Sequence, residues 1–284
     1  MKRPIYAVLI VLLLATLACS INITLPTMKV GPTKTFTVNE PIPSGSSTAV
    51  LNINMGAGSL DLSGGTSALV KGTITYNIPE WDPKVTQSDN AVTITQGEQT
   101  NITGVPSDKL INNWVLKVND TNPLDLSIKA GAYKGSMDLS GLHLSNLSIM
   151  DGASQNTVTF KTPNPELMSN FSYKTGASQV ELDGLANANF TNMQFDGGAG
   201  QYTFDFSGTL NQDAHLTIKT GISSINIDVP ADMSVTFINS GAVSNITTTG
   251  TWTVNGNTYR ASGEGHLLTI DAQIAVGSIK LNRK

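Results

Sequence analysis

A short glycine-led phrase recurs along this sequence, and its spacing constrains the fold more than any other feature. In each copy the glycine is followed by apolar and polar residues in alternation. From Gly131 to Gly241 the successive steps are 21, 24, 22, 23 and 20 residues. A period near 22 residues with variable loops is typical of a solenoid, in which each repeat forms one coil of a continuous stack. The copies begin at Gly56, Gly131, Gly152, Gly176, Gly198, Gly221, Gly241 and Gly277, with looser copies at the second and last of these.

The segments on both sides of each glycine alternate with a period of two. Before the glycine, Leu216 and Ile218 flank a threonine, and after it Val180 and Leu182 flank a glutamate. Such alternation predicts strands with one face in the core and the other in water. We expect Leu62, Leu182, Phe204 and Ile227 to point inward, and Asp61, Glu181, Thr203 and Asn226 to point outward.

Glycine at the head of each copy is explained by a sharp corner between the two strand segments. Stacked coils approach closely there, and a Cβ would exclude the positive-φ conformations that a tight bend often needs. We therefore assign the repeated glycines a structural role in turns. The predicted fold is all-β: a right-handed, single-stranded β-solenoid with coils of about 22 residues, preceded by an N-terminal signal segment and without substantial helix elsewhere.

The charge of the chain argues against one class of partner. Charged residues make up 13% of the sequence, the net charge is −4, and no basic cluster follows the first few residues. Binding to nucleic acid requires concentrated positive charge that displaces counterions from the phosphates. We therefore expect no nucleic-acid partner.

The N-terminus carries the features of an export signal. Lys2 and Arg3 precede an uncharged, mostly apolar run from Ile5 to Ala18, and Cys19 follows. This run is short for a transmembrane helix but suits the apolar region of a signal peptide. The position of Cys19 resembles the lipobox of bacterial lipoproteins, although Thr16 stands where leucine is usual. The resemblance implies a lipidated Cys19 and a protein anchored at the outer face of the cell membrane or at the cell surface; the alternatives are an ordinary signal peptide or an uncleaved anchor.

Composition and rhythm divide the chain into four parts. We predict a signal peptide at 1–18, a flexible tether at 19–47, an N-terminal β sub-domain at 48–126 and the solenoid proper at 127–284. The sub-domain breaks the repeat, and its expected strands are 70–77, 84–88, 91–96 and 113–119. Near the C-terminus Asn255-Gly256 predicts a type I′ hairpin that covers the last coil.

The same residues carry a resemblance to known families. The segment LNINMGAGSLDLSGGTSALVKGTITYNIPEWDPKVTQSDNAVTITQ resembles the N-terminal part of the bacterial toast-rack family. The later GAS and GAG copies and the closing GSIKL resemble the related putative-adhesin domain of unknown function. The resemblance implies an exported β-solenoid and no catalytic residue. Some members of these families occur in envelope-stress responses.

No catalytic or metal-binding pattern stands out in the sequence. His143, His215 and His266 are far apart, and zinc requires three or four convergent ligands. The recurring aspartates near the coil corners lack the nine-residue period of a calcium roll, so turn hydrogen bonds explain them better. We therefore expect no metal and no cofactor.

The predicted function is that of a non-catalytic envelope lipoprotein that acts in adhesion or as an interaction scaffold, with an envelope protein or a glycan as partner. Tyr133, Tyr173 and Tyr202 are candidates for stacking on sugars, but the alternation places the last two in the core. Two alternatives remain open. One is a β-helix enzyme acting on polysaccharides, although Arg260 and Arg283 are the only arginines of the body. The other is the sensor component of an envelope-stress response.

Overall fold

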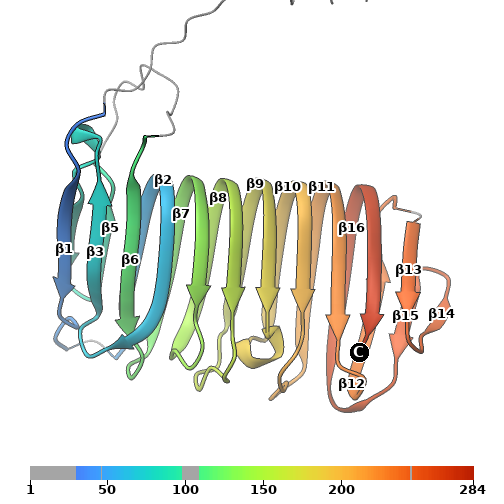
Figure 1. Ribbon diagram of the computed structural model, residues 1–284. Helices are drawn as coiled ribbons and strands as arrows, with labels where there is room; N and C mark the ends of the chain where they lie inside the picture. Colours follow the sequence, from blue (N-terminus) through green and yellow to red (C-terminus); the bar gives the residue numbers. More distant parts are fainter. Residues whose placement is uncertain (1–29, 46, 98–108, 244) are drawn as a thin grey trace, which may run out of the picture.

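The computed structural model describes residues 30–45, 47–97, 109–243 and 245–284 (Figure 1). The predicted signal peptide and Cys19 lie outside the described residues. The described part is nearly all β, as predicted: one open sheet of sixteen strands and two short 3-10 turns, η1 (Pro79–Trp81) and η2 (Leu185–Ala188). Among these residues no helix is long and apolar enough to cross a membrane. The strands are β1 (Lys34–Glu40), β2 (Ala49–Thr66), β3 (Val70–Tyr76), β4 (Lys84–Ser88), β5 (Ala91–Thr95), β6 (Asn112–Asn119), β7 (Leu124–Asp138), β8 (Leu144–Thr159), β9 (Asn170–Asp183), β10 (Asn192–Asp205), β11 (Ala214–Val229), β12 (Met233–Asn239), β13 (Asn245–Thr249), β14 (Thr253–Asn255), β15 (Thr258–Ala261) and β16 (Glu264–Arg283).

The middle of the molecule is a stack of long parallel strands, β2, β7, β8, β9, β10, β11 and β16. Each strand bends at its midpoint, so that its two halves lie on opposite broad faces of a flattened rod (Figure 1). We call one such bent strand a rung. Pairing runs along nearly the whole rung, as in the parallel register of β10 with β11 from Asn192 to Asp205. The predicted stack of coils is therefore confirmed.

At the N-terminal end, the first rung in the chain is not the first in space. The rung β2 pairs with β7 on one side, and on the other side with β5 over residues 50–54 and with β6 over residues 59–66. The strands β3, β1 and β4 then add in antiparallel fashion and close this end. The strands expected between residues 70 and 119 are present with ends shifted by at most one residue, and they continue the same sheet.

One part of the predicted tether is ordered instead. Residues 34–40 form β1, which pairs with β3 from Lys34 opposite Tyr76 to Glu40 opposite Val70. The prediction of a tether through residue 47 is therefore wrong for these residues. Thr35 and Thr37 alternate with Phe36 and the fully buried Val38. This short alternation supplies an inward face that the Thr- and Pro-rich composition of the segment obscures.

At the C-terminal end, the last strand lies inside the stack. The rung β16 pairs with β11 on one side and with β12 and β13 on the other. The strands β15 and β14 follow as an antiparallel hairpin, as predicted. Its central residues are Gly256 and Asn257, because Asn255 pairs with Thr258. Only Gly256 has a positive φ, 59°, so the turn has the glycine-first pattern of type II′ in place of the predicted type I′.

The inward side chains form one continuous core. Leu62, Leu182, Phe204 and Ile227 are buried, which confirms the predicted inward row. The centre of the core is aromatic: the ring of Phe195 lies 4.8 Å from that of Tyr202, 5.0 Å from that of Phe204 and 5.4 Å from that of Tyr173. The predicted burial of Tyr173 and Tyr202 is confirmed, and Tyr133 is buried as well. None of the three is exposed for stacking on a sugar.

Candidate functional site

The repeated glycines form a column along one edge of the rod, which we call the corner edge. In this column a Cβ added to Gly131 would lie 2.3 Å from the carbonyl oxygen of Gly56, one rung away. A Cβ on Gly176 would lie 2.3 Å from the oxygen of Gly152, and one on Gly198 would lie 2.4 Å from the oxygen of Gly176. Glycine is needed at these corners because the backbone of the adjacent rung fills the space of a side chain.

We expect Gly176→Ala to lower the free energy of unfolding by about 2 kcal/mol, because the neighbouring backbone must shift to admit the methyl group. Chemical denaturation followed by circular dichroism measures this change. Ala177→Ser is a matched control, since that side chain is exposed at the next position. Equal stability of Gly176→Ala and the native chain would contradict the close packing of the column.

Two of the predicted corner glycines lie elsewhere. Gly277 pairs with Ser223, so Ala275 is the residue of β16 that lies beside Gly221. Gly277 has a φ of 146°, and a Cβ there would lie 1.7 Å from the oxygen of Ser223. Gly241 lies between β12 and β13, where a Cβ would lie 2.3 Å from the amide nitrogen of Ile274. Both positions require glycine, but through contacts different from those of the column.

Two positions before the glycine column, lysines occupy alternate rungs. Register places Lys129, Lys174 and Lys219 in one row, which we call the lysine row. Met150 and Asp196 occupy the rungs between these lysines, and Gln273 follows the last of them. Rungs about 4.8 Å apart put successive lysines about 9.6 Å apart. The Nζ of Lys174 lies 3.9 Å from Oδ2 of Asp196 with both side chains partly exposed, so this ion pair is weak.

On the other side of the glycine column, small and aliphatic side chains face outward. They form a strip, which we call the alanine strip. It ends in two larger residues, Ile222 and Val276, which are 64% and 60% exposed. Two positions farther along the strands, the amides of Gln155, Gln179 and Gln201 form another row, which begins at a lysine. The strip comprises Ala57, Ala132, Ala153, Ala177, Ala199, Ile222 and Val276.

Three shallow depressions follow one another along the corner edge. One of about 290 Å³ lies around Gly56 and Lys129, one of about 460 Å³ around Lys174 and Gly176, and one of about 490 Å³ around Lys219 and Gly241. Met150 lines the first two and Gly197 lines the last two. The corner edge is therefore an open, nearly flat surface without a deep pocket at these positions.

A buried polar network lies beneath the corner edge. Tyr173 donates its hydroxyl to Oδ2 of Asp151 at 3.0 Å, and Ser178 donates to Oδ1 at 3.3 Å. Thr175 also donates to Oδ1, and Asn156 donates to the hydroxyl of Tyr173 at 2.7 Å. Buried polar groups that pair with one another in this way fix the relative position of neighbouring rungs.

The tyrosines around this network remain protonated at physiological pH. Burial, and then the charge of Asp151, raise the pKa of Tyr202 to about 12. Burial likewise raises the pKa of Tyr133 and of Tyr173. The hydroxyl of Tyr202 lies in the space that Gly197 leaves open, 2.8 Å from where a Cβ would stand. These tyrosines therefore act as neutral structural groups below the surface.

The opposite edge of the rod, where the loops between rungs lie, carries a row of carboxylates. Asp205 pairs in register with Asp228, and Asp183 lies one position beyond the pair of Leu182 with Phe204. Burial, Asp205 and Glu181 together raise the pKa of Asp183. In contrast, although burial acts to raise it, hydrogen bonds from Lys161 and Ser140 lower the pKa of Asp138 in the same row.

We expect Asp183→Asn to stabilise the fold slightly at neutral pH. A raised folded-state pKa means that the ionised carboxylate destabilises the fold, so the gain is full above that pKa, fades as pH falls through it and is lost below the unfolded value of about 3.9. Partial exposure limits the gain to less than about 1 kcal/mol. The folded-state pKa of Asp138 is lowered, so its ionised carboxylate stabilises the fold. Asp138→Asn should therefore lose stability above about pH 3.9, the unfolded value. Thermal unfolding between pH 3 and 8 measures both, and a loss for Asp183→Asn at pH 7 would contradict the assigned repulsion.

Each histidine lies beside one carboxylate from another part of the stack. His143 Nδ1 is 3.2 Å from Oε1 of Glu166, and His215 Nε2 is 3.4 Å from Oδ2 of Asp271. His266 Nδ1 is 3.4 Å from Oδ1 of Asp213. Within the described ranges no three His, Cys, Asp or Glu side chains group as metal ligands. The histidines thus form isolated polar contacts at the surface.

The lysine row is the feature of the corner edge that the sequence analysis missed. A signal for it exists, since Lys-x-Gly occurs at three of the repeated corners, at Lys129, Lys174 and Lys219. The alternation of the strands marks all three as outward. Their alignment required the register of the rungs, which the glycine spacing supplies.

Stacked rungs, a glycine column and antiparallel strands at both ends define an open β-solenoid. The family described as the N-terminal domain of toast_rack (DUF2154) matches residues 27–169 and 163–228. The chain therefore belongs to this family, and the resemblance drawn from the sequence is confirmed. A search of curated proteins found no match.

Two similar solved structures carry names that refer to adhesion. A putative cell adhesion protein from Clostridium sporogenes is 20% identical, with a TM-score of 0.50, and the match covers 89% of this chain and 100% of that one. A putative adhesin from Bacteroides fragilis is 11% identical with a TM-score of 0.36, covering 90% and 98% of the two chains. At 20% identity the likeness to the Clostridium sporogenes protein shows the fold alone.

Proposed function

We propose that this protein is a non-catalytic, membrane-anchored envelope lipoprotein that acts in adhesion or as an interaction scaffold. The observation that carries the proposal is the in-register stacking of the rungs, which aligns rows of outward side chains on the broad faces of the rod, as for Glu181, Thr203 and Asn226. Such a surface offers many equivalent contacts along a line and suits an extended partner better than a small molecule, which prefers a concave pocket. The similar structure from Clostridium sporogenes is named a putative cell adhesion protein, which is consistent with this role.

The proposed anchor is a lipid on Cys19. The described body begins at Val30, and Gly31 donates its amide to the carbonyl of Asn77 at 2.7 Å. The revised tether therefore covers residues 20–30, in place of 19–47. A chain of 11 residues spans at most about 40 Å when fully extended, which keeps the rod close to the membrane.

The basic residues disfavour the polysaccharide-cleaving alternative. The guanidinium of Arg283 donates to the carbonyl oxygens of Met233, Ala231 and Ser262. It thereby ties the end of β16 to neighbouring segments and is occupied structurally. Arg260 lies in the hairpin strand β15, opposite Thr253. Neither arginine is paired with a group of carboxylates of the kind that such cleavage requires.

Three experiments test the proposed function. Cells that express the native chain or Cys19→Ser are fractionated, and we expect the native protein in the membrane fraction and the variant in the soluble exported fraction. The surface-displayed protein is then assayed for attachment to immobilised envelope proteins and glycans. Membrane retention of Cys19→Ser would contradict the lipid anchor. Release of products from pectin, alginate or peptidoglycan would contradict the non-catalytic assignment.

A further inference from the structure

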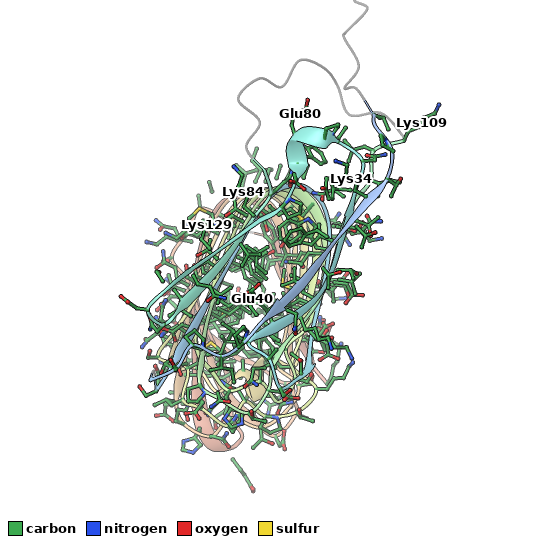
Figure 2. All side chains as sticks on the ribbon, turned by 90° about the vertical axis from the view of Figure 1, so that its left-hand side faces the viewer. Lys34, Glu40, Glu80, Lys84, Lys109 and Lys129 are labelled. Carbon is green, nitrogen blue, oxygen red and sulfur yellow. The ribbon has the colours of Figure 1, made fainter. Side chains whose placement is uncertain are left out.

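Charge is divided between the two edges of the rod. Lysines gather at the corner edge, and acidic side chains outnumber basic ones at the opposite edge, although the chain as a whole is negative. Figure 2 looks at the N-terminal end and shows Lys34, Lys84 and Lys109 toward the corner edge, with Glu80 among them and Glu40 farther away. The basic set is Lys34, Lys84, Lys109, Lys129, Lys134, Lys174 and Lys219, with Glu80, Asp82 and Asp196 as the acids nearby. The opposite edge carries Asp125, Asp138, Glu166, Asp183, Asp205, Asp213, Asp228, Asp232 and Glu264, with Lys71, Lys117, Lys161, Arg283 and Lys284 among them.

The chain enters the folded body at the corner edge. Lys34 pairs with Tyr76, and Tyr76 pairs with Asn112 in the next strand. The side-chain amide of Asn112 donates to the carbonyl of Ala57, which directly follows the first corner glycine. Residues 1–29, including the hydrophobic signal segment and Cys19, therefore connect to the body on the same side as the lysines.

Aliphatic side chains accompany the lysines. Met150 stands within the lysine row and is 46% exposed, and Ile222 and Val276 end the alanine strip. Between them the surface consists of alanines and glycine backbone. An edge that combines lysines, exposed aliphatic groups and a flat profile has the composition of a surface that rests on the interface of a bilayer.

We propose that the corner edge lies against an anionic membrane surface, with the lysines contacting lipid phosphate groups and Ile222 and Val276 reaching the interface. The inference rests on the proposed anchoring, which brings this edge close to the bilayer. In this orientation the broad faces of the rod stand upright on the membrane, and the acidic opposite edge faces outward. The repulsion between that acidic edge and anionic lipids favours the same orientation.

A bilayer fits these observations better than a soluble anionic polymer. A polymer chain would be held in a groove, whereas the depressions along the corner edge are open and shallow. The exposed Ile222 and Val276 offer nothing to a polyanion but gain free energy in an interface. The N-terminal segment joins the body on the same side, so a membrane anchor would hold the corner edge near a bilayer. No such link would hold this edge near a soluble polymer.

The first test uses the full chain carrying Cys19→Ser, mixed with vesicles of phosphatidylcholine alone or with added phosphatidylglycerol. Binding to neutral vesicles measures the contribution of the hydrophobic N-terminal segment. The additional affinity for anionic vesicles therefore measures the contribution of the lysines at the corner edge. We expect the triple variant K129Q/K174Q/K219Q to bind anionic vesicles about 100-fold more weakly, since each lysine near such a surface changes affinity about five-fold. The matched control K71Q/K117Q/K161Q has the same net charge and should bind like the parent.

The second test reports orientation. In the Cys19→Ser chain, a cysteine at Ala177 or at Ser207 carries an environment-sensitive fluorophore. Ala177 is exposed on the alanine strip, and Ser207 is exposed beyond the end of β10 at the opposite edge. We expect anionic vesicles to shift the emission to the blue for the label at 177 and to leave the label at 207 unchanged.

Three outcomes would overturn the membrane contact. These are equal vesicle binding by the two lysine triples, a blue shift confined to position 207, or lysine-dependent binding of soluble polygalacturonate without lysine-dependent vesicle binding. Failure of the proposed function would look different. Loss of attachment to envelope partners, or membrane retention of Cys19→Ser in cells, leaves the vesicle comparison of the two triples unaffected.

Discussion

Leu182→Asp should lower the free energy of unfolding by about 4 kcal/mol or more. Leu182 is fully buried in β9, in register with Val158 on one side and Phe204 on the other. An aspartate there loses apolar burial and places an unpaired charge among hydrocarbon side chains, two effects that add. Urea denaturation followed by tryptophan fluorescence measures the change.

Glu181→Gln provides the control for this substitution, because Glu181 points outward from the same strand and its replacement should change stability by less than about 0.5 kcal/mol. If Leu182→Asp does not fold, Leu182→Ala tests the same position with an expected loss of about 3 kcal/mol. A more stable Leu182→Asp than Glu181→Gln would reverse the assignment of inward and outward faces.

Removal of β16 should have the second large effect. Deleting residues 264–284 opens a slot between β11 and the pair β12 and β13, and it exposes an edge of β11 that pairs with β16 from Ala214 to Val229. It also removes the bond from the Lys284 amide to the carbonyl of Val229. Since an exposed, long strand edge recruits other chains, we expect the truncated protein to associate and to lose protection of β12–β15 against proteases.

Size-exclusion chromatography and limited proteolysis measure these effects. A synthetic peptide of residues 264–284 added to the truncated chain should fill the slot and restore both protection and the monomeric elution volume, whereas a scrambled peptide should not. A truncated chain that stays monomeric and resists cleavage within residues 233–261 would show that β16 is dispensable for the C-terminal end.

The repeated part of this fold could be predicted from the sequence. The spacing of the glycines and the alternation of apolar and polar residues identified the inward row through Leu182 and Phe204. They could do so because each rung has the same residue pattern and similar neighbours. The corner column from Gly56 to Gly221 has the close backbone contacts that glycine permits. Local rules suffice where neighbouring rungs are nearly equivalent.

The order of rungs at the C-terminal end could not be predicted. The step from Gly221 to Gly241 is 20 residues, which is an ordinary period and suggests the next rung in line. Instead β12 and β13 lie one place farther out and β16 fills the gap. Pairing between strands separated by dozens of residues decides this order, and a periodicity does not encode it. The shift of Gly277 from the glycine column follows from the same arrangement.

The N-terminal end departs from the repeat for a related reason. Among the described residues between β5 and β6, no corner glycine lies beside Gly56. The side chain of Gln96 accepts from the amides of Gly56 and Ala57 at 2.8 and 3.3 Å, and it also accepts from Asn112 at 2.9 Å. An amide side chain thus replaces the backbone of a missing corner. A single glutamine in a polar stretch gives no sequence signal for this role.

The equivalence of β8, β9 and β10 has a consequence for how such proteins change over evolutionary time. Because each of these rungs meets its neighbours through the same glycine, the same alanine and the same inward row, duplication or loss of one complete repeat by recombination would preserve these three kinds of contact. The molecule would then lengthen or shorten in increments of about 4.8 Å while its two terminal arrangements stay intact. Length, more than surface chemistry, is thus the property that this architecture can vary most freely.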